Sequence, residues 1–582
     1  MISKRYAKAN NRYMGDAYDP TEPESYILYV DANNLYGMAM SEPLPYDEFK
    51  WMSAADCADI DWTAQTVDQL YGYFVECDLH YPDQLHDQHN DYPLAPERLT
   101  VEDYLLSDKQ VGLRGEYTIS HTASSKLIPN FFDKTKIMLH YRNLQFYLLH
   151  GMELTKVHRV IKFKQARWLE PYIRTNTELR ALTQDPVEIK LRKDMNNVIY
   201  GKTCENLTKR TDIKLVNTEK ECQKLIRKPH CLRCQIFAHD LVGIEMQKVK
   251  CLINKPTYVG FTVLELSKLH MYKFHYDHLK QWYPEADLLF TDTDSLVYHI
   301  RTDDLYTELA AHREHFDFSN YPIDHPSYGD ENKMAVGKMK DEAAGNLVSE
   351  FVGLRPKMYS YTTIIPDKPE PKEAKRAKGI QRAAMVDIRH ADYLAQLRVA
   401  VENYVNIRRI GQKHHRIFTV EGVKRGLCAF DDKRYLLGDG IHTYAHGHYK
   451  IREEQTRPTD LDVETMSIPV SSLLDGDDMA ASNYIAISNT EAVQRGVQPH
   501  VSRSRVMNVV SGMDLRSALS VVPVRDALQP STSTAADITT IPKRGHPDFR
   551  DFDNFDEDSD SDDDDMRGVF DLAKSVAYDD SY

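Results

Sequence analysis

The stretch LLFTDTDSLVYHI, residues 288–300, decides how this chain is best interpreted. Two apolar runs rich in β-forming residues flank a short polar segment, which predicts two strands joined by a tight turn. Asp292 and Asp294 lie at the tip of this hairpin, and residues two apart in an extended chain point to the same side. The pattern therefore presents two carboxylates together.

A pair of acids at a hairpin tip has an ordinary explanation, because Asp and Thr favour solvated turns. A calcium-binding EF-hand loop is excluded, since a ligand position and the invariant glycine of such a loop would fall on Leu296 and Val297. The functional interpretation is a Mg²⁺ site, because Mg²⁺ is usually held by one or two carboxylates together with substrate phosphates.

A phosphoryl-transfer site with two metal ions about 3.5–4 Å apart requires a further carboxylate on a neighbouring strand. Asp31 is the candidate, because it ends the apolar run YILYV (26–30) and opens a turn. A strand-terminating Asp without a role is the alternative.

Cations that could bind phosphates lie on a predicted helix over residues 186–207. Lys190, Lys193, Asn197 and Tyr200 follow helical spacing and share one face, which suits phosphates at one end and a stacked base at the other. Arg180, on the preceding predicted helix, could add a second phosphate contact. A solvated amphipathic face is the alternative interpretation.

The periodicity of the rest of the chain predicts an α+β fold with mostly antiparallel strands. Helices are expected over 136–154, 170–184, 186–207 and 263–283, with a break at Asp185–Pro186 because proline disfavours helix in the residue before it. A strand is expected from residue 24 to the turn-prone DANN (31–34), and another at 357–365. A loop rich in Pro and Lys then covers 366–379, and helices continue to about residue 410.

The charge of the chain is concentrated at its C-terminal end. Residues 451–582 carry 26 acidic and 12 basic residues, out of a net charge of −15 for the whole chain. This segment has no sustained period and holds a long acidic run, so it is predicted to be a disordered tail. The remainder is nearly neutral, so a nucleic-acid surface would have to be a local basic face.

Membrane insertion and secretion are not expected, because no apolar run reaches the length of a membrane span and the first residues lack a signal core. The eight cysteines show no framework spacing, which indicates reduced thiols in an intracellular compartment. Cys231 and Cys234, preceded by His230, form a single CxxC pair. Zinc sites need four ligands, for which Cys222 and Cys251 are loose candidates, so bystander thiols are the favoured interpretation.

Four segments in order resemble the motifs of family B DNA polymerases. DANNLYG (31–37) resembles motif A, DxxSLYP; KDMNNVIYG (193–201) resembles motif B, KxxxNSxYG; and FTDTDS (290–295) resembles motif C, YxDTDS. RPKMYS (355–360) is similar to the KxY motif of the protein-primed branch. The resemblance covers residues 2–450 and points to the polymerases of Polinton/Maverick transposons, related viruses and linear plasmids.

The resemblance implies a right-hand polymerase with a palm that holds an antiparallel sheet, helical fingers and a thumb. Asp31 and Asp294 resemble the palm ligands of two Mg²⁺ ions, for which Mn²⁺ is expected to substitute, and Asp292 supports them. The implied nucleotide-binding residues are Leu35, Tyr36 as the steric gate against a 2′-hydroxyl, Arg180, Lys190, Lys193, Asn197 and Tyr200. The implied DNA-binding residues are Lys357, Tyr359, Lys375, Arg376 and Lys378, although a solvated loop explains the last three equally well.

The chain departs from the family pattern in three places. Motif A has Asn34 and Gly37 where many relatives carry Ser and Pro, and motif B has Val198 where they carry Ser. Only 30 residues precede Asp31, where the family carries a 3′–5′ exonuclease domain. No exonuclease activity is therefore expected: either the chain lacks proofreading, or it is a fragment of a longer gene.

The expected organisation follows the motifs. It comprises a linker remnant (1–25), palm with motif A (26–59), an insertion of the protein-primed type (60–150), fingers with motif B (151–210), a second insertion and a palm helix (211–285), palm with motif C and KxY (286–360), thumb (361–450) and the acidic tail (451–582).

The function expected from these motifs is DNA-directed DNA synthesis, in protein-primed replication of a viral or transposon-like element. The implied partners are primer-template DNA, dNTPs and a terminal protein primer; the chain is expected to be a monomer. Nuclear localisation would fit such replication, for which KRAKGIQR (375–382) is a weak import signal. Two alternatives stay open: an inactive DNA-binding remnant of such a polymerase, and a reverse transcriptase, which usually shows YxDD instead of DTDS.

Overall fold

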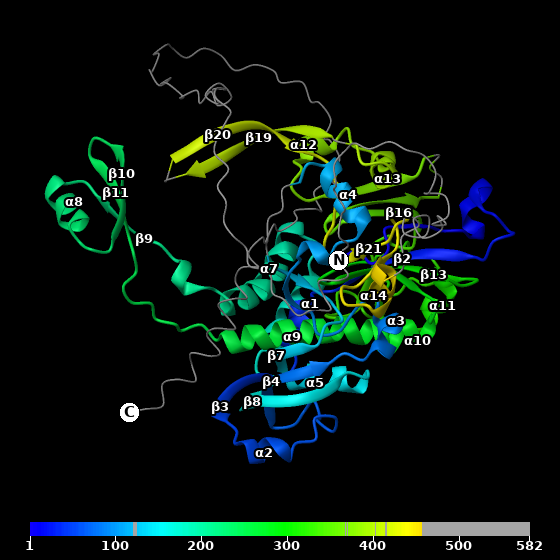
Figure 1. The fold of residues 1–582 in the computed structure, drawn as a ribbon, viewed down its shortest axis with the longest axis horizontal. Helices are drawn as coiled ribbons and strands as arrows, with labels where there is room; N and C mark the ends of the chain where they lie inside the picture. The colour runs from blue at the N-terminus through cyan, green and yellow to red at the C-terminus, as the bar shows by residue number, and fades with distance from the viewer. Residues whose placement is uncertain (120–124, 367, 369, 402, 414–415, 457–582) are drawn as a thin grey trace, which may run out of the picture. The chain divides into compact units, whose positions relative to one another are not determined.

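A computed structural model describes residues 1–456 apart from 120–124, 367, 369, 402 and 414–415 (Figure 1). The predicted α+β class is confirmed: helices are mixed with sheets whose named strands all pair antiparallel except β14 with β15. Nearly all of the predicted acidic tail lies outside the described residues. Its first residues, 451–456, belong to helix α14 (Tyr449–Thr456). Among the described helices, none is both long and apolar enough to cross a membrane.

The large sheet is built around strand β2 (Ser25–Ala32). One edge of β2 pairs with β13 (Ser295–Arg301), and its other edge is shared by β15 (Met339–Asp341) and β16 (Leu347–Arg355). The predicted hairpin over 288–300 is confirmed as β12 (Asp287–Asp292) and β13. The strands run in the order β12–β13–β2–β16–β17–β18, with β17 at Met358–Ile364 and β18 at Lys372–Ala377; β1 (Tyr6–Lys8) pairs with β16, and β14 (Phe316–Asp317) pairs with β15.

Parts of the expected linker (1–25) and of the expected loop (366–379) belong to this sheet. The first residues of the expected linker run along it, because Ser3 N donates to Leu289 O at 2.8 Å and β1 pairs with β16. The prediction of a loop over 366–379 was wrong for Lys372–Ala377, which form β18. Its charged sequence has no strand signal, and pairing with β17 creates the strand.

A second sheet has the order β3–β8–β4–β7. It consists of β3 (Leu44–Trp51), β4 (Tyr71–His80), β7 (Lys134–His140) and β8 (Glu153–Ala166), so it draws on three of the expected segments. The helix predicted over 136–154 was too long: it is confined to α5 (Tyr141–Leu149) between β7 and β8. Pairing of β7 with β4 overrides the helical spacing of the residues before Tyr141.

Helix α9 (Thr257–Lys273) lies between the two sheets (Figure 1). Met271 belongs to the core of the large sheet, whereas Val263 and Leu266 belong to the core beside the second sheet. The helix continues through a π-helical segment, η5 (Phe274–Leu279), into α10 (Lys280–Trp282), so the helix predicted over 263–283 is confirmed and begins six residues earlier.

The predicted pair of helices around Asp185 is confirmed as α6 (Glu170–Leu182) and α7 (Pro186–Thr203). The Asp185 side chain accepts from Val187 N at 2.9 Å and caps α7, whose first residue is a proline. Asn176 Nδ2 donates to Asn196 Oδ1 at 3.1 Å in the buried seam between the helices. This pair, hereafter the α6–α7 hairpin, packs on α1 (Leu35–Met40).

The expected second insertion contains a three-stranded sheet in the order β10–β11–β9, with α8 against it. Its elements are β9 (Asp212–Val216), α8 (Glu219–Ile226), β10 (Cys231–Ala238) and β11 (Leu241–Met246). The other short elements of the chain are α2 (Ala54–Ala58), α3 (His86–His89), β5 (Glu97–Thr100), α4 (Asp108–Glu116), β6 (Ser125–Ile128), α11 (Leu305–Ala311), β21 (Tyr435–Leu436) and β22 (Thr443–Tyr444).

The segment after β18 begins as the predicted helices, α12 (Arg382–Met385) and α13 (His390–Arg398). The prediction of helix as far as residue 410 was wrong, because Tyr404–Lys413 form β19, which pairs with β20 (Arg416–Arg425). Val405 and Ile407 are β-branched and alternate with polar residues, a strand pattern that the charged surroundings obscure.

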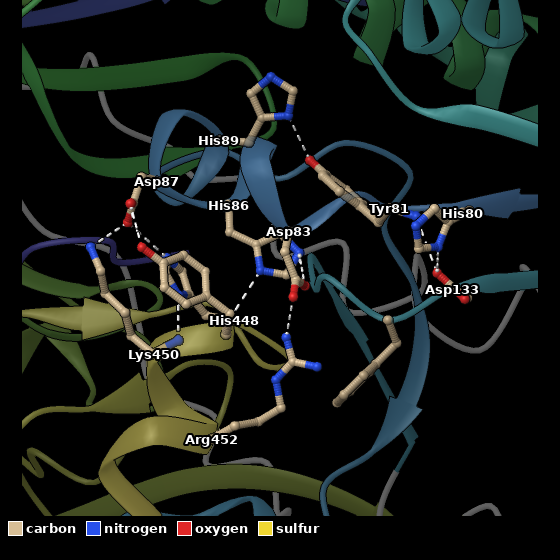
Figure 2. A network of polar contacts seen from close by, with 12 residues as sticks. His80, Tyr81, Asp83, His86, Asp87, His89, Asp133, His448, Lys450 and Arg452 are labelled. Carbon is tan, nitrogen blue, oxygen red and sulfur yellow. Dashed lines mark hydrogen bonds and ion pairs between the residues drawn. The ribbon is translucent and has the colours of Figure 1, made fainter.

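The end of the described chain folds back on the segment around α3 (Figure 2). Lys450 pairs with Asp87, and Arg452 Nη2 lies 2.6 Å from Asp83 Oδ2. Residues of this returning segment also contact the start of the chain, since Thr443 Oγ1 donates to Ser3 O at 2.5 Å. The last part of the expected thumb therefore packs on other segments of the fold.

Arg434 joins the returning segment to the segment around α3, and it should be essential for the stability of the fold. It is 2% exposed, and its guanidinium donates to Asn90 O at 2.8 Å and to Thr443 Oγ1 at 2.6 Å. We expect Arg434→Ala to lower the free energy of unfolding by about 3 kcal/mol, because it leaves buried acceptors without donors. Arg452→Ala, at a surface ion pair, should cost less than about 1 kcal/mol. Denaturant unfolding of both variants checks this, and equal losses would contradict it.

Candidate active site

The three predicted acids meet at one end of the large sheet. Strand register aligns Ser295 of β13 with Asp31 on one side and with Asp292 on the other. The turn between β12 and β13 is tight, because Asp294 N donates to Asp292 O at 2.6 Å and Thr293 adopts a φ of 54°. Ala32 N donates to Asp294 O at 2.7 Å and ties the turn to β2. The hairpin tip therefore lies against the end of a strand more than 250 residues earlier in the chain.

These acids repel one another. Burial raises the pKa of Asp31, and the nearby carboxylates of Asp294 and Glu342 raise it further. Burial likewise raises the pKa of Asp294, with help from neighbouring carboxylates, and Lys193 opposes the shift in both acids. Lys340 also opposes the shift in Asp31. A site of this kind gains from a bound cation, which would relieve the repulsion between the carboxylates.

The sequence did not indicate two members of this cluster, Lys340 and Glu342. Lys340 lies opposite Asp31 in the pairing of β15 with β2, and Glu342 N donates to Tyr29 O at 2.9 Å. The only signal was the short charged run K-D-E at 340–342, which resembles a solvated turn. Nothing local to that run distinguishes an acid at the site from an acid in solvent.

The α6–α7 hairpin brings one residue of the predicted cationic face, Lys193, near the acids. Lys193 is the member whose charge acts on both Asp31 and Asp294. Lys190 is exposed, and Asn197 is partly exposed on the same helix. Carboxylates of the large sheet and a lysine of α7 therefore act on one another here, a charge pattern that suits a metal–phosphate ligand.

Two predicted aromatic residues from separate motifs lie ring against ring. Tyr36 of α1 and Tyr200 of α7 stack with ring centroids 4.1 Å apart and planes inclined by 19°. Both are partly buried, and Leu35 beside Tyr36 is buried in the core of the large sheet. The sequence placed each tyrosine at a nucleotide, and the fold makes them neighbours.

The unusual residues of motif A, Asn34 and Gly37, depend on each other. Asn34 adopts a left-handed conformation with φ 44°, and its side chain accepts from Gly37 N at 3.2 Å, so it caps α1. A Cβ at residue 37 would lie 2.4 Å from the Asn34 side-chain amide. Glycine at 37 is thus what allows asparagine to cap this helix.

The carboxylate that acts on Arg180 is not one of the three predicted acids. Arg180 is half-buried on α6, and Asp317 is the carboxylate whose charge acts on it. Its Nε is buried and has no hydrogen-bond partner among the described residues.

The predicted DNA-binding residues occupy two kinds of position. Lys357 lies in the β16–β17 turn with φ 60°, and its Nζ is 3.8 Å from Asp292 Oδ1, next to the acids. Tyr359 is buried, and its hydroxyl shares a 3.0 Å hydrogen bond with that of Tyr29, beneath the site. Lys375 donates to Ile388 O and so joins β18 to the segment before α13. The other two are Arg376, partly exposed on β18, and Lys378, exposed just beyond it.

Two groups of side chains were candidates for metal ions, the acids at the hairpin tip and the CxxC segment. Among the described residues, no three His, Cys, Asp or Glu side chains gather so as to hold a metal ion by themselves. Neither the acids nor the CxxC segment is therefore a complete metal cage. Two carboxylates suffice, however, for a Mg²⁺ ion that completes its coordination with phosphates and water. Asp31 and Asp294 fit a metal that enters with a nucleotide.

Binding of Mg²⁺ and a dNTP should depend on pH in a defined direction. Without ligand, the raised pKa values mean that stability falls as the pH rises from about 3.9 through the folded-state pKa, since the folded state holds these protons more tightly. Ligation requires the ionised carboxylates, so the stabilisation by ligand should grow from about pH 6 to about pH 8. At a ligand concentration 100 times Kd, it should reach about 2.7 kcal/mol. Thermal unfolding with and without Mg²⁺–dNTP checks this; a response independent of pH contradicts it.

The solved structures that are similar to this chain include several of one DNA polymerase. No protein-family model matches the chain, and no curated protein does. The orthorhombic crystal form of Phi29 DNA polymerase has a TM-score of 0.42 and 13% identity, covering 73% of this chain and 62% of that chain. A ternary complex of that polymerase with primer-template DNA and incoming nucleotide substrates has a TM-score of 0.41 and 13% identity, covering 73% and 61%. This chain thus spans about three fifths of the polymerase it resembles, and the function proposed below rests on the site geometry.

Proposed function

We propose that this chain is a DNA-directed DNA polymerase that adds dNTPs to a primer 3′-hydroxyl with the help of two Mg²⁺ ions. The observation that supports the proposal most is the meeting of Asp31 and Asp294, both of which are influenced by the charge of Lys193. Partly buried carboxylates on which a lysine of a helical hairpin acts have the charge pattern that a metal-bound triphosphate needs.

Each residue then has a role in the transfer. Asp31 and Asp294 would hold the metal ions, which would supply charge that favours ionisation of the primer hydroxyl and stabilises the leaving pyrophosphate. Lys193 binds the triphosphate and neutralises charge as it builds up on the leaving group. Tyr36 contacts the sugar and excludes a 2′-hydroxyl by its ring, and Tyr200 packs on the base.

In this proposal the large sheet is the palm and the α6–α7 hairpin forms the fingers. The thumb, residues 361–450, includes the β19–β20 hairpin. Exposed basic side chains on that hairpin suit contact with DNA phosphates, namely Arg408, Arg409, Lys413, Arg416 and Lys424. Protein priming, a terminal protein partner and a transposon-like or viral element are proposed from the resemblance of the motifs.

Primer extension with the full chain tests the proposal. A 5′-labelled DNA primer on a DNA template should be extended when Mg²⁺ and dNTPs are present, and chelation of the metal should stop extension. A parallel RNA template should be used poorly; preferential use of RNA would identify a reverse transcriptase. Binding of primer-template without extension would overturn the proposal in favour of a non-catalytic DNA-binding module.

A further inference from the structure

Asp317, at the end of β14, is a buried acid outside the set of residues to which the motifs assign roles. It is 1% exposed. Its Oδ2 accepts from Asn33 Nδ2 at 2.7 Å and from Met334 N at 2.9 Å, and its Oδ1 accepts from Ser319 N at 3.0 Å. Hydrogen bonds to a buried carboxylate are strong, so these contacts hold Asn33 in place.

Asn33 belongs to the turn that connects the acid site to the stacked tyrosines. It follows Asp31 by two residues and precedes Tyr36 by three. Two backbone hydrogen bonds, hereafter the clamp, hold Asn33 to the loop at 337–338. Asn33 N donates to Lys338 O at 2.9 Å, and Gly337 N donates to Asn33 O at 2.7 Å. The Asp317 contact adds the side chain to this clamp.

The clamp is anchored to the central helix. His270 of α9 donates from Nε2 to Gly337 O at 2.8 Å, so the loop that holds Asn33 is itself tied to α9. Gly337 has a φ of 77°, and a Cβ there would lie 2.6 Å from Met38 of α1. The loop thus contacts both the turn at Asn33 and helix α1, so a shift of the loop would displace both.

Asp317 is also related to the metal-binding end of the sheet and to the α6–α7 hairpin. Register places it opposite Lys340, which in turn lies opposite Asp31. Its charge acts on Arg180 of α6, whose buried Nε has no hydrogen-bond partner in the described part of the chain. One carboxylate thus contacts the turn of motif A directly and lies opposite the lysine that pairs with Asp31 in the strand register.

We propose that Asp317 is a positioning residue for nucleotide selection: through its hydrogen bond to Asn33 it holds the turn that precedes Tyr36. The inference rests on the proposed polymerase function. Loss of the carboxylate should let the turn shift, so that the Tyr36 ring no longer excludes a 2′-hydroxyl reliably. The substrate expected to gain is a ribonucleoside triphosphate.

The ratio of rNTP to dNTP incorporation tests this role. A residue that only stabilised the fold would lower the incorporation of both nucleotides without changing their ratio. Asp317→Ala should raise the ratio of rNTP to dNTP incorporation at least about tenfold, with a larger rise in KM for dNTP than fall in kcat. Asp317→Asn keeps an oxygen for Asn33 and should change the ratio less. Asn33→Ala should reproduce the effect, and the double variant with Asp317→Ala should be no worse than either single one. Asp330→Asn, an exposed acid between β14 and β15, is the matched control and should leave the ratio unchanged.

A measurement without catalysis separates this inference from the proposed function. Hydrogen exchange at the Asn33 and Gly337 amides should be at least about tenfold faster in Asp317→Ala than in the unaltered chain, and unchanged in Asp330→Asn. If the unaltered chain fails to extend a primer, the polymerase proposal fails while exchange still tests the clamp. Unchanged exchange, or an unchanged sugar ratio in an active chain, overturns the role of Asp317.

Discussion

Asp294→Asn is expected to reduce Mg²⁺-dependent dNTP addition by at least about 10³-fold, because it removes a metal ligand that stabilises charge in the transition state. The same result is expected for Asp31→Asn. The two acids come from different strands and meet only through the pairing of β2 with β13. Asparagine is nearly isosteric, so the fold should be retained and the loss should appear in kcat more than in DNA binding.

The control for this prediction is Asp303→Asn. Asp303 is exposed just beyond the other end of β13, so the substitution makes the same chemical change away from the site. Primer extension at saturating dNTP and a DNA-binding titration should be run on all three variants. Activity of Asp294→Asn within a few-fold of that of Asp303→Asn would show that the metal site lies elsewhere.

Tyr36→Ala is expected to raise the ratio of rNTP to dNTP incorporation by about 10²-fold, because the ring that would meet a 2′-hydroxyl is gone. The stack of Tyr36 on Tyr200, at 4.1 Å between centroids, orients this ring. Single-nucleotide insertion with matched dNTP and rNTP measures the ratio.

Two further variants separate the roles of the stacked rings. Tyr36→Phe keeps the ring and should keep the discrimination. Tyr200→Ala should raise KM for dNTP about tenfold, through loss of base stacking, while the sugar ratio changes little. If Tyr200→Ala relaxes sugar discrimination as much as Tyr36→Ala, the two rings do not have separate roles in sugar and base recognition.

Prediction from the sequence succeeded where a local pattern was strong. The hairpin at 288–300 and the helix pair around Asp185 have clear periodicity and clear breaks, and both formed as expected. It failed where pairing decided the structure: Lys372–Ala377 and Tyr404–Lys413 became strands although their charged sequences suggest loop or helix. Strand propensity depends on the neighbouring strand, which local sequence does not contain.

The sequence by itself determined that Asp292 and Asp294 share a hairpin tip and that Lys190, Lys193, Asn197 and Tyr200 share a helical face. Both follow from periods of two and 3.6 residues, which act over a few positions. Only the tertiary structure decided that Asp31 lies opposite Ser295, that Glu342 joins the acids and that Asp317 holds Asn33. Those contacts join residues far apart in the chain, and they depend on strand register and on burial between the sheets, which no local pattern specifies.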